Sequence, residues 1–116
     1  FAAAAHFMSL SVRPTAVFAA NDESAIGFLS GLRQYGLTCP RDISMIGFDD
    51  LGVAAHYTPP LTTMRQPREL LGRMAAEMLI DILEDAEHRR GPMRIVLNSE
   101  LIVRESTAHL PLRTSG

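Results

Sequence analysis

The chain has 116 residues, of which 47% are apolar, so it is long enough for one compact domain with an ordinary hydrophobic core. Its 11 cationic residues, all arginine, face 13 acids, and the formal charge of -2 gives no general attraction to nucleic acid or anionic lipid. Any DNA contact would need a part that this sequence does not contain. The single cysteine, Cys39, excludes an internal disulfide, fits a reducing cytoplasm and is interpreted as a surface-loop thiol.

The opening stretch "FAAAAHFMSL" is apolar, but it lacks a basic leader and is too short to span a bilayer. It is typical of the end of a helix. Together with the absence of an initiator methionine, this predicts that the chain is a piece of a longer protein.

A buried strand is predicted next, within "RPTAVFAAND", because a short apolar run ends at Asn21 and Asp22. A helix should follow, since Ala25, Phe28, Leu29 and Leu32 recur at helical spacing. Gly36 stands where a left-handed helix cap is expected. The run "ISMIGF" then predicts a second buried strand that ends at Asp49 and Asp50, followed by a short helix or loop in "LGVAAHY".

The segment "TPPLTTMRQ" predicts a third extended segment, and Pro67 suits the first position of a helix. That helix carries an unbroken apolar stripe, formed by Leu70, Leu71, Met74, Ala75, Met78, Leu79, Ile82 and Leu83. So large an apolar surface should be covered by a second chain, a swapped element or further protein. Two last runs, "RIVL" and "LIVRE", are interpreted as extended segments.

Alternation of strands and helices predicts an α/β fold with a parallel sheet flanked by helices. In such sheets ligands bind beyond the carboxyl ends of the strands. The three central strands end at Asn21, Asp49 and Gln66, whose polar side chains could converge on one small polar molecule. Each also has a structural interpretation: Asn21 or Asp22 as a helix cap, Asp49 and Asp50 as a turn with a cap, and Gln66 as a cap of the long helix.

Motifs for other functions are missing from the sequence. His6, His56, His88 and His109 show no metal-ligand spacing, and neither a "GxSxG" nucleophile motif nor a "GxGxxG" or "GxxxxGK" phosphate loop occurs. Neither metal, cofactor nor catalysis is therefore expected. By pattern alone, Ile26 and Tyr57 fit either core packing or an interface.

Four blocks, "PTAVFAAND", "GLTCPRDISMIGFDD", "TPPLTTMRQP" with "LG" soon after, and "LIVRES", give the chain a family likeness from Pro14 to Ser106. In this order and spacing the chain resembles the lactose/galactose repressor family of bacterial transcription regulators. The resemblance implies an effector-binding domain similar to periplasmic sugar-binding proteins, with two α/β lobes. Residues 1–66 would belong to the C-terminal lobe, 67–92 to the helix that returns to the N-terminal lobe, and 93–116 to the crossover, the final strands and the tail.

The resemblance also implies roles for single residues. Asn21, Asp49 and Gln66 match ligand-contacting positions, which implies a sugar or related small molecule as effector, and Ile26 and Tyr57 match positions at a homodimer interface. Asp50 is left with shaping the turn after the strand. The expected protein is a cytoplasmic, non-enzymatic regulator that meets operator DNA through a headpiece absent from this chain. The alternative is a periplasmic sugar-binding protein for transport.

Overall fold

The computed structural model describes residues 2–85, 91 and 93–110 of the chain, and His88 lies outside the described residues. Two compact units are present. The first comprises Phe1–Arg65 and Glu100–Gly116, and the second comprises Gln66–Ser99. Each unit is described by itself below.

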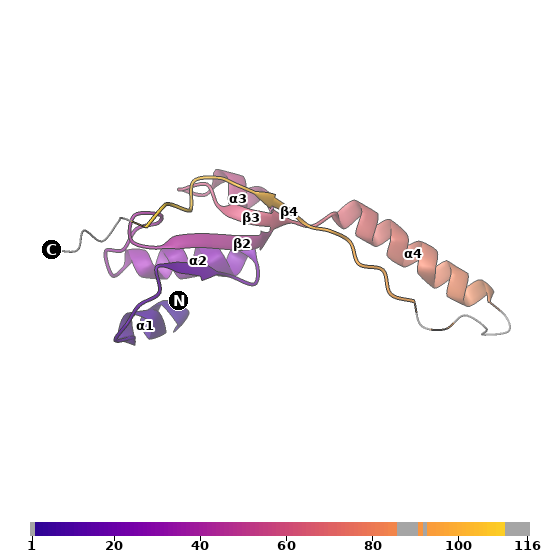
Figure 1. The fold of residues 1–116 in the computed structure, drawn as a ribbon, viewed down its shortest axis with the longest axis horizontal. Coiled ribbons are helices and arrows are strands. Elements are labelled where there is room, and N and C mark those ends of the chain that lie inside the picture. The colour runs from indigo at the N-terminus through magenta and orange to yellow at the C-terminus, as the bar shows by residue number, and fades with distance from the viewer. Residues whose placement is uncertain (1, 86–90, 92, 111–116) are drawn as a thin grey trace. The chain divides into compact units, whose positions relative to one another are not determined.

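The first unit is built on a four-stranded sheet whose spatial order follows the chain (Figure 1). Its strands are β1 (Ala16–Phe18), β2 (Ser44–Asp49), β3 (Thr62–Arg65) and β4 (Glu100–Ile102). The first three strands run parallel, as the sequence predicts. Strand β4 runs antiparallel to β3 with Glu100 opposite Arg65, because the chain returns to the sheet at the edge where β3 left it. The predicted parallel sheet flanked by helices is thus confirmed for β1 to β3, and β4 adds an antiparallel strand that was not predicted.

Helices cover the sheet as the alternating pattern predicts. Helix α1 (Ala2–Ser9) packs on α2 (Asp22–Arg33), and α2 packs on β2, whereas the short helix α3 (Gly52–His56) links β2 to β3. Phe7 and Phe28 meet edge to face with 5.6 Å between their ring centres. Leu32 and Met45 are among the large, fully buried core side chains, at 1% and 0% exposure. Each such side chain stabilises the fold by about 1.5–3 kcal/mol through burial alone.

Helix α2 begins and ends as its sequence predicts. The backbone of Asn21 is extended, and its side-chain oxygen accepts a hydrogen bond from the Ser24 amide at 2.8 Å, which makes it the N-cap. At the other end Gly36 has a positive φ of 75°, a conformation that glycine adopts without strain. The predicted left-handed position after the helix is therefore confirmed.

A serine hydroxyl joins β2 to β3 near their amino ends. The Ser106 hydroxyl donates to the Met45 carbonyl at 2.6 Å and accepts from the Thr62 amide at 2.8 Å. The Ser106 carbonyl in turn accepts from the Met45 amide at 2.8 Å. Ser106 is fully buried, so a residue from the end of the described chain completes the hydrogen bonding between two inner strands.

The second unit contains α4 (Arg68–Glu84). Pro67, predicted at the first helical position, is its N-cap, so the helix begins one residue later than predicted. None of its residues is buried, and the exposed side chains include Leu71 at 49%, Leu79 at 58% and Leu83 at 75%. The predicted apolar stripe is thus open in this single chain. The run Arg94–Leu97, interpreted from its sequence as extended, forms no strand. Its apolar residues suggested a strand, but within the described part of the chain they pair with no other strand.

Candidate functional site

Two of the three predicted ligand residues lie at one edge of the sheet. Asn21 follows β1 after a two-residue link, and Asp49 is the last residue of β2, which pairs with β1 in parallel. Gln66 directly follows Arg65, the residue that stands opposite Asp49 in β3, but Gln66 belongs to the second unit. The structure therefore brings Asn21 and Asp49 to the carboxyl edge of the first unit.

The Asn21 side chain has a structural use that the sequence left open. Its oxygen caps α2, which leaves the amide NH2 group as the part of this side chain with the chemistry to donate to a ligand oxygen. Capping and ligand contact are thus compatible in one asparagine.

Asp22, which follows the helix cap Asn21, is withdrawn from solvent. It is fully buried. One carboxylate oxygen accepts from the Thr63 hydroxyl at 2.5 Å, and the other accepts from the Leu51 amide at 2.8 Å. Gly47 lies directly beneath it, since a Cβ there would stand 2.3 Å from the carboxylate. Asp22 therefore ties the start of α2 to β3 and to the start of α3.

The corner after β2 has an unusual backbone. Asp49 and Asp50 both have positive φ, at 109° and 53°, which L-residues seldom adopt. Such conformations cost about 1–3 kcal/mol each and need support from their surroundings. Support comes from the Asp50 amide, which donates to the Thr63 hydroxyl at 3.4 Å, and from the bond between Leu51 and Asp22.

Asp50 forms two ion pairs, so it does more than shape the turn. Arg65 Nε lies 2.6 Å from one carboxylate oxygen, and an Arg104 guanidinium nitrogen lies 2.7 Å from the other. Burial alone would raise the pKa of Asp50, but the hydrogen bonds and charges of Arg104 and Arg65 outweigh it and hold that pKa below the usual value. Sequence reasoning missed both arginines as site residues, because their distances of 15 and 54 positions from Asp50 give no local signal.

The two predicted interface residues are partly buried against the core of the first unit. Ile26 packs beside the core from α2, and Tyr57 ends α3. The Arg33 guanidinium lies 5.1 Å from the centre of the Tyr57 ring, a cation–π distance. The Tyr57 hydroxyl is 3.5 Å from that of Ser30. Both residues thus contact the core and keep a part of their surface exposed.

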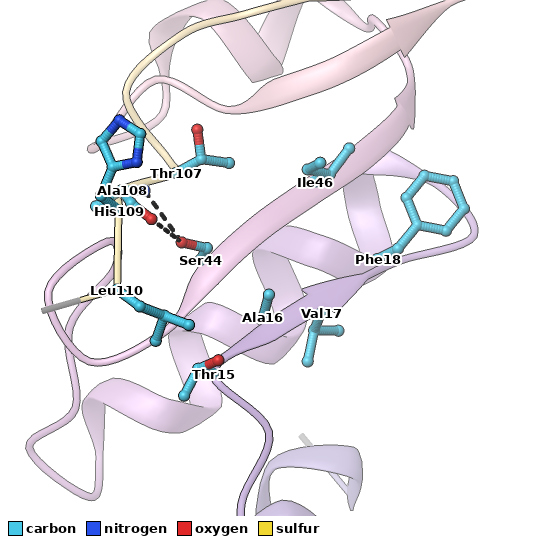
Figure 2. Close-up of a pocket in the computed structure, with 10 residues that line it drawn as sticks. All are labelled: Thr15, Ala16, Val17, Phe18, Ser44, Ile46, Thr107, Ala108, His109 and Leu110. Atoms are coloured by element: carbon cyan, nitrogen blue, oxygen red, sulfur yellow. Dashed lines mark hydrogen bonds between the residues drawn. The ribbon is translucent and has the colours of Figure 1, made fainter. Parts of the chain in front are cut away.

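A cavity of about 570 Å³ lies away from these residues, on the face of the sheet beside β1 and β2 (Figure 2). Residues 107–110 run alongside it, held where the Ser44 hydroxyl exchanges hydrogen bonds with the Ala108 backbone. Neither Asn21 nor Asp49 lines this cavity. Its walls are largely apolar, and we base the site on the strand ends instead.

Within the described ranges, no group of three or more histidine, cysteine or acidic side chains could hold a metal ion. Cys39 is partly buried, and this burial raises the pKa of its thiol to about 11, which disfavours the reactive thiolate. Among the helices of the described residues, none has both the length and the apolarity needed to cross a membrane.

Comparison with known proteins gives a consistent family. Residues 2–107 match the family described as periplasmic binding protein-like domain. The chain is 40% identical over 108 residues to the HTH-type transcriptional repressor PurR of Vibrio campbellii, covering 93% of this chain and 32% of that protein. It therefore spans about a third of the length of this curated relative.

Solved structures show the same likeness. The lac repressor dimer bound to operator and an anti-inducer superimposes with a TM-score of 0.79 at 31% identity, covering 94% of this chain and 37% of that one. A LacI family transcriptional regulator from Enterococcus faecium with bound ribose gives a TM-score of 0.76 at 35% identity, covering 93% and 39%. The likeness thus extends over nearly all of this chain.

Proposed function

The chain belongs to the periplasmic binding protein-like domain family, as part of an effector-binding domain of the lactose/galactose repressor type, and on that premise we propose that it senses a small polyhydroxyl effector for a transcriptional regulator. One observation carries the proposal: in this chain, Asn21 and Asp49 lie at the carboxyl ends of neighbouring parallel strands and make that edge of the sheet polar. Ligands bind at this edge in open α/β sheets.

The chemistry of the edge suits a neutral sugar. The Asp49 carboxylate can accept hydrogen bonds from vicinal hydroxyls, and the carboxamides of Asn21 and Gln66 can both donate and accept. We assign all three as ligand contacts. The bound ribose of the Enterococcus faecium regulator supports a sugar or a related small molecule as the effector class.

The rest of the proposal follows the family. We assign residues 1–66 to the C-terminal lobe, 67–92 to the helix that returns to the N-terminal lobe, and 93–116 to the crossover, final strands and tail. The regulator acts as a homodimer through Ile26 and Tyr57, supported by the dimeric lac repressor. It reaches operator DNA through a separate headpiece, works in the cytoplasm where that DNA lies, and catalyses no reaction.

Regulation follows from a difference in affinity. A ligand that binds one arrangement of the two lobes more tightly than another shifts the population toward the first, and it thereby changes operator affinity. A periplasmic sugar-binding protein for transport would share the fold, but the repressor relatives favour the regulator.

Replacement of Asp49 tests the proposal directly. In the full-length regulator, Asp49→Ala should weaken binding of D-ribose, or of the sugar or nucleobase that stabilises the wild-type protein most in a thermal-shift panel, by about 10- to 100-fold. Operator affinity without ligand should stay unchanged. Glu105→Ala, which removes an exposed carboxylate of the same unit, is the control. A calorimetric titration identical for wild type and Asp49→Ala would contradict the proposal.

A further inference from the structure

One carboxylate at the end of β2 forms ion pairs with residues of two other strand segments. The Asp50 side chain is only 9% exposed, and each of its oxygens is paired with a different arginine. Arg65 comes from the end of β3, and Arg104 follows β4. Asp50 itself follows β2, so its ion pairs connect the end of β2 to two strands that are distant in sequence.

Both arginines are themselves anchored within the first unit. A second guanidinium nitrogen of Arg104 donates to the Leu61 carbonyl at 2.9 Å, and its backbone amide donates to the Thr62 hydroxyl at 2.9 Å. Arg65 lies 3.8 Å from Glu100 in an additional, more exposed pair. A displacement of Asp50 would therefore be passed to β3 and to the segment after β4.

Arg65 and Arg104, the partners of Asp50, belong to the segments through which the chain leaves and re-enters the first unit. The chain leaves the first unit directly after Arg65 and returns to it at Glu100. On the other side, Asp50 is the direct neighbour of Asp49, and both have the positive φ of the strained corner. The backbone of the proposed ligand contact is thus one residue from the carboxylate that pairs with Arg65, the last residue of β3, and with Arg104, just after β4; β3 and β4 are the strands through which the chain leaves and re-enters the first unit.

We propose that Asp50 is a positioning residue that couples ligand contact at Asp49 to the two strands connecting the first unit with the second. This inference rests on the proposed function, since it takes Asp49 as a ligand contact. Ligand binding at the corner shifts or stiffens Asp50, and the ion pairs carry that change to Arg65 and Arg104. Networks of ion pairs can carry such coupling, and the distances of 2.6 Å to Arg65 and 2.7 Å to Arg104 supply one here.

The ion pairs of Asp50 are tested first, by hydrogen exchange of the full-length regulator measured by mass spectrometry without ligand. Asp50→Asn keeps the side-chain size but removes the charge, and it should raise exchange at least threefold in peptides covering residues 49–51, 62–65 and 100–104 together. The core of α2 should exchange as in wild type. Glu105→Gln is the matched control, because it removes one exposed negative charge beside Arg104 and should change none of these peptides.

A second variant keeps the test informative if Asp50→Asn does not fold. Arg65→Met removes the more exposed partner, whose side chain is 49% accessible, and should raise exchange in the same three segments by a smaller factor. If exchange rises in only one or two of the three segments of a folded variant, or in none of them, the inference is overturned.

D-ribose added to the same proteins measures the coupling itself. In wild type, ribose should slow exchange at residues 49–51 and also at 62–65 and 100–104. In Asp50→Asn, the protection should remain at 49–51 but be lost in the other two segments, which a purely structural role would not produce. Equal protection of all segments in both proteins overturns the inference. No protection in wild type counts against D-ribose as the effector, and the ligand-free exchange data then decide the inference alone.

Discussion

Two regions reverse the usual rule that polar groups are exposed and apolar groups are buried. One is the strand-end cluster of the first unit, formed by Asp22, Asp50, Thr63, Arg65 and Arg104; the other is helix α4 of the second unit. The cluster withdraws the carboxylates of Asp22 and Asp50 from water, whereas α4 leaves leucines and isoleucines exposed. Every buried side-chain nitrogen or oxygen of the described residues has a hydrogen-bond partner, which explains why the cluster tolerates burial. A polar group can be buried where it has a hydrogen-bond partner. An apolar side chain is buried only where another surface covers it.

The largest effect should come from removing the buried acid. Asp22→Ala leaves the Thr63 hydroxyl and the Leu51 amide without their acceptor, at about 1–3 kcal/mol each, so we expect a loss of about 4 kcal/mol in the free energy of unfolding. Urea denaturation measures it. Glu23→Ala changes the next residue, which is exposed, and should cost less than about 1 kcal/mol. Similar costs for the two variants would remove the polar half of the comparison.

A matched pair of leucines compares the two regions most directly. Leu32→Ala, in α2 at 1% exposure, should cost about 3 kcal/mol, because it leaves a cavity in the core. Leu79→Ala, in α4 at 58% exposure, should cost less than about 0.5 kcal/mol in the 116-residue chain at concentrations where it is monomeric. Helix propensity hardly contributes, since both sites are helical.

The same leucine pair also reports whether α4 is covered. If another part of the full-length regulator packs on the stripe, Leu79→Ala should become nearly as costly there as Leu32→Ala. A low cost in both the short chain and the full-length protein would refute the prediction that the apolar stripe is covered.

Gly47 offers a smaller change at the base of the polar cluster. Gly47→Ala would place a Cβ 2.3 Å from the Asp22 carboxylate and 2.9 Å from a Leu61 methyl group, so the core must shift, at about 2 kcal/mol. Gly27→Ala, in α2 with no atom near the new Cβ, should instead stabilise the protein by about 0.5–1 kcal/mol. Thermal unfolding of the two variants should therefore move in opposite directions.

Acid should weaken the cluster through Asp50, and this is the smallest expected effect. Its pKa in the folded protein lies below the usual 3.8, so the stabilisation is complete above that value and is lost as the pH falls through the lower folded pKa. The stability advantage of wild type over Asp50→Asn should be constant at neutral pH and shrink below about pH 3.8. A constant difference down to strong acid would show that Asp50 does not gain its stability from ionisation.

Much of the first unit could be predicted from local patterns. Helix α2, strands β1 and β2, and the left-handed Gly36 all follow from spacing and turn chemistry within a few residues. Resemblance added the family, which comparison confirms. The antiparallel β4 and the absence of a strand at Arg94–Leu97 were not predicted, because pairing partners lie far away in the chain.

The site was predictable only in its outline. Polar residues at strand ends indicated the edge, but nothing local distinguishes Asp22, which is buried and structural, from Asn21 beside it. Asp50 was assigned to the turn, and its pairing with Arg104 depends on a contact across 54 positions. Such contacts arise from the sheet's register, which a single sequence does not reveal.

The bridge made by Ser106 has a consequence for synthesis on the ribosome. Residues 66–99 must be translated before Ser106 can reach Met45 and Thr62, so β2 and β3 wait for their link on the order of seconds. During that interval β3 is an outer strand of the nascent sheet and has no partner on its outer side. Translation speed through the second unit thus sets how long this unfinished sheet is exposed to chaperones and to other nascent chains.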